Sequence, residues 1–276
     1  MTSREREDRT IDRFCKRLEA IEQLVVSVLK RPDRDNPGKR GCDAIIERGS
    51  RRFALEHTTI DSFLGQRADS DRFRRVLIPI EEEIRNAYPE SWIEICIPAH
   101  AAPNGTNWSG ITRALAEGCI RRIAEMGFGD YVPAFQPADV PFSVSILREP
   151  SSDGPTCFVM RAPPSNWTAQ LEQDFARAIR EKRDQLAPYQ EQGLPTILLL
   201  DSDDIHVNRR SLVEGFSRAA KRETTEAIDE VYITESSRDP VWLYPVKLHG
   251  RVYPEVAEFP WFFRRQYLLT YGREPR

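Results

Sequence analysis

The sequence has few of the residues from which zinc sites and disulfide frameworks are built. Its 276 residues include only five cysteines and four histidines, and no two cysteines form a Cys-x-x-Cys pair. Widely spaced cysteines in an odd number are typical of buried, reduced thiols rather than of structural metal sites. The charged N-terminal residues also lack the apolar core of a secretory signal. We therefore expect a cytoplasmic protein.

Long apolar runs and the common nucleotide motifs are missing as well. No apolar run approaches the roughly 18 residues that a membrane-spanning helix needs, so we expect no membrane partner. There is no P-loop, no Gly-x-Gly-x-x-Gly after a strand and no Gly-x-Ser-x-Gly. The 40 basic and 43 acidic side chains nearly balance. The chain as a whole is therefore not a basic nucleic-acid binder, although a local basic groove is compatible with this balance.

What the chain does contain is a regular alternation of helical and strand patterns. Apolar residues at helical spacing predict a first helix that begins after Thr10 and continues to Leu29. Further helices are expected at about 69–86, 109–126, 167–186 and 209–221, and strands at about 42–47, 53–58, 92–97, 142–147, 157–160, 196–200, 230–234 and 241–248. This order predicts one α/β domain over 1–276, with a mixed central sheet flanked by helices and an inserted helix and hairpin at about 104–155.

The hairpin expected at 42–58 carries two carboxylates. Residues two apart in a strand share a face, so Glu56 lies with Ala54 and Thr58. The hairpin can bring Asp43 and Glu56 together at one end of the sheet. Converging carboxylates supply the hard oxygen ligands that Mg²⁺ or Mn²⁺ prefers. Such an ion lowers the pKa of a bound water and offsets the charge of a scissile phosphate.

Asp43 followed by Glu56-His57-Thr58, with a helix on either side, resembles the PD-(D/E)XK restriction-endonuclease-like superfamily over roughly Thr10 to Ile97. The resemblance implies a restriction-endonuclease-like fold and a magnesium-dependent nuclease, in which Asp43 and Glu56 bind the metal. It also implies a nucleic-acid partner, DNA more than RNA, and it allows a homodimer. The motif lysine would fall at Thr58, which is a departure because threonine carries no positive charge.

A substitute for this lysine is expected on the 167–186 helix. Lys182 lies within an apolar stripe, where a lysine is unusual. The segment from Ala178 to Leu186 is similar to that of superfamily members whose lysine lies on a neighbouring helix. This similarity implies that Lys182 polarises the attacking water and that Gln185 helps to hold water or phosphate. The glutamate that the family often adds from its first helix corresponds to Glu22, which would complete the metal shell.

Plainer interpretations stand beside these. Asp43 and Glu56 also suit a turn and an ordinary strand position, and Lys182 also suits a lysine that extends its amine to solvent. His57 is better explained as a packed histidine than as a base. The missing motif lysine leaves open an alternative function, a catalytically degenerate nuclease scaffold that binds nucleic acid or a protein partner.

A second acidic segment gives a different candidate metal site. Asp201 and Asp203 follow the most hydrophobic expected strand, and an Asp-x-Asp at that position resembles the Toprim-type site of primases and topoisomerases. The same residues suit a turn that precedes the helix expected at 209–221. The structural interpretation is the more economical one for this segment.

Overall fold

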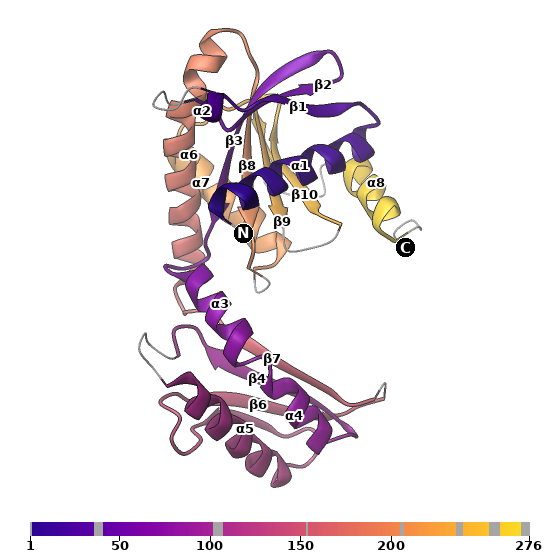
Figure 1. The fold of residues 1–276 in the computed structure, drawn as a ribbon, viewed down its shortest axis with the longest axis vertical. Coiled ribbons are helices and arrows are strands. Elements are labelled where there is room, and N and C mark those ends of the chain that lie inside the picture. Colours follow the sequence, from indigo (N-terminus) through magenta and orange to yellow (C-terminus); the bar gives the residue numbers. More distant parts are fainter. Residues whose placement is uncertain are drawn as a thin grey trace. The chain divides into compact units, whose positions relative to one another are not determined.

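The computed structural model describes residues 2–35, 41–101, 107–152, 154–204, 207–235, 240–253 and 260–271. The chain has a mixed α/β fold with two sheets and divides into two compact units (Figure 1). Unit 1 combines Met1–Ser62 with Thr168–Arg276, and unit 2 is the continuous segment Phe63–Trp167. Within the described ranges, no helix is long and apolar enough to cross a membrane.

Unit 1 contains a seven-stranded sheet with the order β1-β2-β3-β8-β9-β10-β11. Its strands are β1 (Val26–Lys30), β2 (Ala44–Arg48), β3 (Arg51–Ile60), β8 (Thr196–Ser202), β9 (Glu230–Glu235), β10 (Trp242–Leu248) and β11 (Arg251–Val252). The strands β1 to β3 form an antiparallel meander, whereas β3, β8 and β9 are parallel. The antiparallel pairs β9–β10 and β10–β11 complete the sheet. The expected hairpin of β2 and β3 is therefore confirmed, and β3 is an interior strand.

Helices cover both faces of this sheet. The helices of unit 1 are α1 (Ser3–Glu22), α2 (Pro32–Asp35), α6 (Trp167–Glu191), α7 (Arg209–Arg222) and α8 (Pro260–Tyr271). Apolar residues of α1 and α8, among them Phe14 and Phe262, share a buried cluster with Leu55 of β3 and Leu199 of β8. The opposite face of β3 carries Glu56 and lies against α6, since Lys182 of α6 donates a hydrogen bond to Glu56.

The first helix differs from the expectation at both ends. It begins at Ser3, because the Thr2 side chain accepts a hydrogen bond from the Glu5 backbone N–H and the Glu5 carboxylate accepts one from Thr2 N, which forms a capping box. It ends at Glu22, because Gln23 adopts a left-handed conformation with φ of 61°. Val26–Lys30 is then free to form β1 at the edge of the sheet, so the predicted continuation of the helix to Leu29 is wrong.

Unit 2 contains a four-stranded sheet with the order β5-β6-β4-β7 and three helices. Its elements are α3 (Gln66–Val76), α4 (Ile80–Ala87), β4 (Ser91–Pro98), α5 (Trp108–Ala124), β5 (Tyr131–Phe135), β6 (Val144–Pro150) and β7 (Thr156–Ala162). Apolar side chains of α4 and α5 pack on the sheet in a core that belongs to this unit. Unit 2 therefore has a hydrophobic core of its own, as a small domain does.

The extent of unit 2 differs from the insertion expected from the sequence. One domain with an insertion at about 104–155 was expected, and the structure divides the chain into two compact units, the second of which begins at Phe63; residues 104–106 and 153 lie outside the described part. The range 104–155 contains helix α5 and an antiparallel hairpin of β5 and β6, whereas the expected strands at 142–147 and 157–160 do not pair with each other, since β4 lies between β6 and β7. The single helix expected at 69–86 is divided into α3 and α4 before Pro79.

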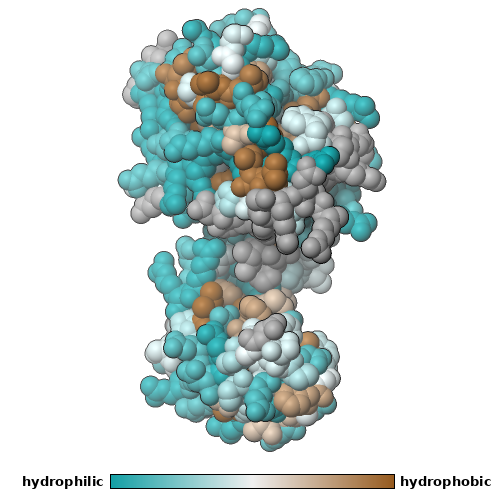
Figure 2. Space-filling model, turned by 90° about the vertical axis from the view of Figure 1, so that its right-hand side faces the viewer, coloured by the Kyte–Doolittle hydropathy of each residue, from teal (hydrophilic) through white to brown (hydrophobic). Residues whose placement is uncertain are grey.

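The surface gives less functional information than the interior. Figure 2 shows a mainly hydrophilic face on which hydrophobic residues lie in small groups. Exposed apolar side chains are normal on proteins, whereas a buried charge requires a partner or a function. Several charged residues are buried, and Glu56, with 1% exposure, is the least accessible of them.

Candidate functional site

Glu56 lies in the middle of the sheet of unit 1. Its strand, β3, pairs on one side with β2 and on the other with β8, where Glu56 is opposite Leu198. The alternation of the strand turns Glu56 away from the cluster that contains Leu55. A carboxylate in such surroundings loses its hydration, and this cost must be offset by hydrogen bonds, by an opposite charge or by protonation.

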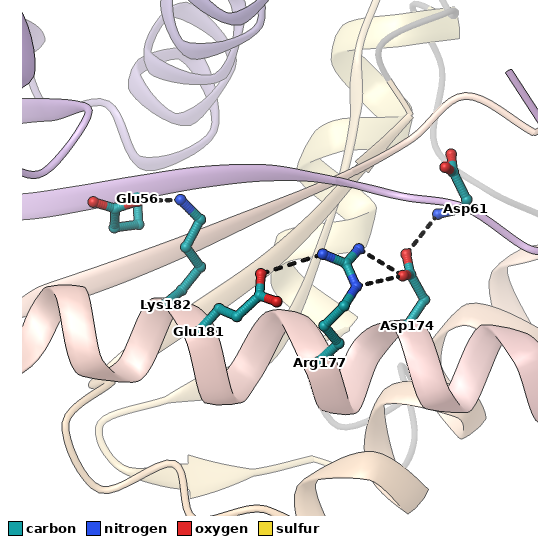
Figure 3. A network of polar contacts seen from close by, with 6 residues as sticks. All are labelled: Glu56, Asp61, Asp174, Arg177, Glu181 and Lys182. Atoms are coloured by element: carbon teal, nitrogen blue, oxygen red, sulfur yellow. Dashed lines mark hydrogen bonds and ion pairs between the residues drawn. The ribbon is translucent and has the colours of Figure 1, made fainter. Parts of the chain in front are cut away.

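Helix α6 supplies the opposite charge. Lys182 Nζ donates to Glu56 Oε2 at 2.6 Å, and the lysine side chain is 17% exposed (Figure 3). The same helix is joined to the end of β3, where Asp174 Oδ2 accepts a hydrogen bond from Asp61 N at 2.9 Å. These two contacts align α6 antiparallel to β3. The structure thus brings together Lys182 and Glu56, which the sequence analysis had paired.

Asp43 joins this pair from the start of β2. Its Oδ2 accepts a hydrogen bond from His57 N at 2.7 Å, and its carboxyl group lies within hydrogen-bonding reach of the Glu56 carboxyl group. The preceding residue is fixed by α6, because Cys42 N donates to the Tyr189 hydroxyl oxygen at 2.9 Å. One helix therefore positions both carboxylates, Glu56 through Lys182 and Asp43 through its neighbour.

The close carboxylates perturb one another. Burial and the charge of Asp43 raise the pKa of Glu56 from 4.5 to about 8, against the opposing effect of Lys182. Burial also raises the pKa of Asp43, and Lys182 opposes this shift. For Lys182, burial lowers the pKa, but the charges of Glu56 and Asp43 more than compensate and leave it raised. The three groups are therefore electrostatically coupled, and their titrations depend on one another.

Two further carboxylates extend the cluster. Oxygen atoms of Glu7 on α1, Asp33 on α2 and Asp43 all lie within 4.8 Å of one another. Burial, followed by the charges of Asp43 and Asp33, raises the pKa of Glu7 to about 7. Glu7 had a sequence signal, since it lies four residues before Ile11 and so on the apolar stripe of α1. Glu7 was not predicted as a site residue, because the helix was expected to begin only after Thr10. No sequence pattern indicated Asp33.

Glu22, the expected first-helix ligand, lies elsewhere. Its carboxylate forms a two-point ion pair with Arg48 at the far end of β2, and Arg48 NH1 also donates to Glu230 Oε2 at 2.7 Å. This buried network stabilises the junction of α1, β2 and β9. The structure does not bring Glu22 to Asp43 and Glu56, because it lies four turns further along the helix than Glu7.

The other residues considered from the sequence, Gln185, His57 and Thr58, also differ in their positions relative to the cluster. Gln185 is one turn from Lys182 on α6, and its buried Oε1 has no hydrogen-bond donor among the described residues. His57 is buried, and the alternation of β3 places its side chain on the face opposite Glu56. Thr58 pairs with Leu200 in the sheet, and its position contributes no charge. Gln185 is thus on the same helix and one turn from Lys182, whereas the His57 side chain is on the other face of β3.

The Asp201 and Asp203 segment has a different arrangement. Asp201 is a buried residue of β8 opposite Thr59, and Asp204 accepts a hydrogen bond from the Ser62 hydroxyl. Within the part of the chain that the structure describes, Glu7, Asp33 and Asp43 form the only group of three or more potential ligands close enough to share an ion. The acidic turn after β8 therefore offers no comparable site among those residues.

Comparison with known proteins adds no further constraint. No protein-family model matches the chain, and neither the curated proteins nor the solved structures include a significant match.

Proposed function

We propose that this protein is a metal-dependent phosphodiesterase that cleaves nucleic acid, with a fold of the PD-(D/E)XK restriction-endonuclease-like kind. The element order supports the proposal: α1, the antiparallel strands β1 to β3, helix α6 and then β8 parallel to β3 form a continuous arrangement once unit 2 is set aside. The observation that carries it is the 2.6 Å contact between Lys182 and Glu56. It gives the site a positive charge that Thr58 cannot provide.

The residues present fit a hard divalent cation. Glu56 Oε1 is buried without a hydrogen-bond donor among the described residues, and it lies beside the Asp43 carboxyl group. Two such oxygen donors, with no thiolate or imidazole between them, suit Mg²⁺ or Mn²⁺ better than a soft metal. Asp43 and Glu56 would hold the cation. When bound, it would lower the pKa of a coordinated water and offset negative charge on the scissile phosphate.

The other side chains of the site have separate roles in hydrolysis. An ammonium group has three N–H donors, and Glu56 takes one of those of Lys182. The remaining donors would orient the attacking water. As its oxygen bonds to phosphorus and the P–O bond to the leaving group breaks, these donors would stabilise the negative charge, the proton of the water would pass to solvent and the leaving oxygen would take a proton from solvent. Gln185 lies one turn from Lys182 on α6, and its buried Oε1, which has no hydrogen-bond donor among the described residues, would accept a hydrogen bond from the same water.

Glu56→Gln tests the proposal. It keeps the shape of the side chain but removes the charge, so we expect Mg²⁺- or Mn²⁺-dependent cleavage to fall by at least about a hundredfold while the circular-dichroism spectrum stays unchanged. Glu47→Gln on the same hairpin is the matched control, because its side chain is 40% exposed and lies outside the cluster. DNA and RNA, single- and double-stranded, are assayed in parallel, with DNA expected to be cleaved faster.

An unchanged rate in Glu56→Gln would reject the catalytic assignment. A parent protein that binds nucleic acid but cleaves none of the substrates would instead favour the degenerate scaffold. Two further parts of the proposal have tests of their own. We propose that the protein is a homodimer, which sedimentation tests. We also propose a cytoplasmic location, because free cysteines are typical of a reducing compartment, and cell fractionation tests it.

A further inference from the structure

A groove of about 630 Å³ lies within unit 2, where the end of α3, the start of α4 and the first turns of α5 meet. Its volume falls in the range of roughly 300–1,000 Å³ that is typical of binding sites for small molecules. Every residue that lines it belongs to unit 2, whereas the residues proposed for catalysis all belong to unit 1. The proposed chemistry therefore leaves this groove without a role.

The aromatic side chain of the groove is Trp108, the first residue of α5. The start of this helix is fixed by Asn107, whose Oδ1 accepts hydrogen bonds from Gly110 N at 3.3 Å and from the Ser109 hydroxyl at 2.9 Å. The Thr112 hydroxyl donates to Trp108 O at 2.8 Å. The indole is half-buried and packs against the apolar core of unit 2. The fold therefore holds in place an aromatic surface that a ligand in the groove can contact.

Charged side chains of both signs line the same groove. Arg75 at the end of α3 and Arg113 on α5 supply two guanidinium groups, while Glu83 on α4 and Glu117 on α5 supply two carboxylates. All four residues are exposed, and none forms an ion pair or a side-chain hydrogen bond within the described ranges of the chain. Their donors and acceptors are therefore available to a ligand that lies against Trp108.

This combination of groups matches the parts of a nucleotide. A guanidinium group binds phosphate through two parallel N–H donors, and an indole stacks on the face of a nucleobase. Carboxylates accept hydrogen bonds from the amino group of a base such as cytosine. A base can stack on a side chain only where it is unpaired and unstacked from its neighbours, so the groove suits a single strand better than a duplex.

We infer that this groove of unit 2 binds a nucleotide within a single-stranded segment of the substrate. Trp108 stacks on the base, and Arg75 and Arg113 contact the phosphate groups on either side of it. The inference rests on the proposed function, because that function makes nucleic acid the substrate. The binding itself requires neither the metal nor the catalytic residues of unit 1, so it can be measured when cleavage is absent.

The test measures the Kd of the full-length protein for a short fluorescein-labelled single strand of DNA, by fluorescence anisotropy in the presence of EDTA. Trp108→Leu keeps an apolar side chain against the core of unit 2 but removes the aromatic ring, so Kd should rise about tenfold or more. Arg113→Gln should also raise Kd, and it should reduce the slope of log Kd against log salt concentration by about 0.7, the value for one phosphate contact on a single strand. The parent should bind the duplex of the same sequence more weakly than the single strand.

Arg121→Gln is the matched control for Arg113→Gln. Arg121 is an exposed residue of the same helix that does not line the groove, so its variant should keep the Kd and the salt slope of the parent. Arg113 is itself exposed, so Arg113→Gln tests the groove even if Trp108→Leu destabilises unit 2. Circular dichroism of each variant monitors its folding.

An unchanged Kd in the folded Trp108→Leu and Arg113→Gln variants overturns the inference, as does equal affinity of the parent for duplex and single strand. A parent that binds no oligonucleotide also overturns it and would leave a protein ligand for the groove. Because EDTA prevents cleavage, these outcomes are separate from the test of Glu56. Weaker binding in the groove variants, with Glu56→Gln as active as the parent, supports the groove and rejects the proposed catalytic site. Unchanged binding in the groove variants, with cleavage lost in Glu56→Gln, overturns the groove alone.

Discussion

Lys182 Nζ lies 2.6 Å from Glu56 Oε2, although 126 residues separate the two in the chain. The contact joins α6 to the central strand β3, and all of unit 2 is inserted between them (Figures 1 and 3). A lysine in an apolar helix stripe and a glutamate in the middle of a sheet are each unfavourable alone. Together they form a hydrogen-bonded pair, and buried titratable groups with perturbed pKa values of this kind cluster at functional sites.

The first prediction concerns Lys182→Met. Removal of the ammonium should lower metal-dependent cleavage by about 10²–10⁴-fold, because the attacking water loses its positive partner. It should also raise the pKa of Glu56 above its value of about 8, since Lys182 now lowers it. Nuclease assays and a pH titration of the variant measure the two effects. Lys221→Met, at an exposed position on α7, is the control, and equal losses in the two variants would contradict the role of Lys182.

The sequence predicted many of the helices and strands but not the division of the chain into two compact units. Apolar periodicity predicted β2, β3, β8, β9, β10, α6 and α7 of unit 1 to within about five residues, because buried faces repeat at the spacing of the element, but it did not predict β1, β11 or α8. It could not show that β4 would enter between β6 and β7, because strand order depends on contacts that a local pattern does not encode. It also could not show where α1 ends and β1 begins, since Val25 and Leu29 fit both the helical and the strand spacing of apolar residues.

The site residues that the sequence could predict are those whose type is unusual for their position in a helix or strand. Lys182 was identifiable because a charge interrupts an apolar stripe, and the structure brings it to Glu56. Glu22 was misplaced because glutamates at the edge of a stripe are common, and its true partner, Arg48, carries no local signal. Asp33 could not be found, because its place in the cluster arises only when α2 folds over the hairpin.

A second prediction concerns the pH dependence of the metal-free protein. Glu56 in the unfolded chain loses its proton near pH 4.5, whereas in the folded chain it keeps it until about pH 8. Unfolding therefore releases a proton between these values, and the unfolding free energy should fall as pH rises through this window, by up to about 1.4 kcal/mol per pH unit for one proton. Denaturant titrations in chelator at pH 5, 6.5 and 8 measure this slope.

The same window should govern cation binding. A divalent ion competes with the protons of Glu56 and of Glu7, whose pKa is raised to about 7, so the apparent affinity for Mn²⁺ should increase from pH 5 to pH 8. Glu7→Gln and Glu56→Gln should each flatten this increase. An affinity that stays constant across the range would show that these carboxylates do not exchange protons for metal.

A third prediction separates Glu22 from the metal site. Arg48→Met removes the common partner of Glu22 and Glu230 and leaves two largely buried carboxylates unpaired, so it should lower the unfolding free energy by about 3–5 kcal/mol. Glu22→Gln keeps a hydrogen bond to Arg48 and should cost less. Neither variant should change the number of bound Mn²⁺ ions. Loss of an ion in Glu22→Gln would return this residue to the metal shell.

The fourth prediction is that unit 1 folds without unit 2. The chain leaves unit 1 at Ser62 and returns at Thr168, and Asp61 N lies 2.9 Å from Asp174 Oδ2. Thr168 is six residues before Asp174 on α6, a rise of about 9 Å, so a short Gly-Ser linker can replace residues 63–167. Unit 2 has its own core around β4, α4 and α5, and the apolar cluster beneath α1 consists of residues of unit 1 alone.

We expect the shortened chain to unfold cooperatively and to bind Mn²⁺ with the same stoichiometry as the full protein, because Glu7, Asp33, Asp43, Glu56 and Lys182 all belong to unit 1. Cleavage of nucleic acid is measured on the same sample. A folded, metal-binding chain that no longer cleaves would assign substrate binding to unit 2, because the reacting groups would be intact. A chain that fails to fold would show that unit 2 is part of the fold of unit 1.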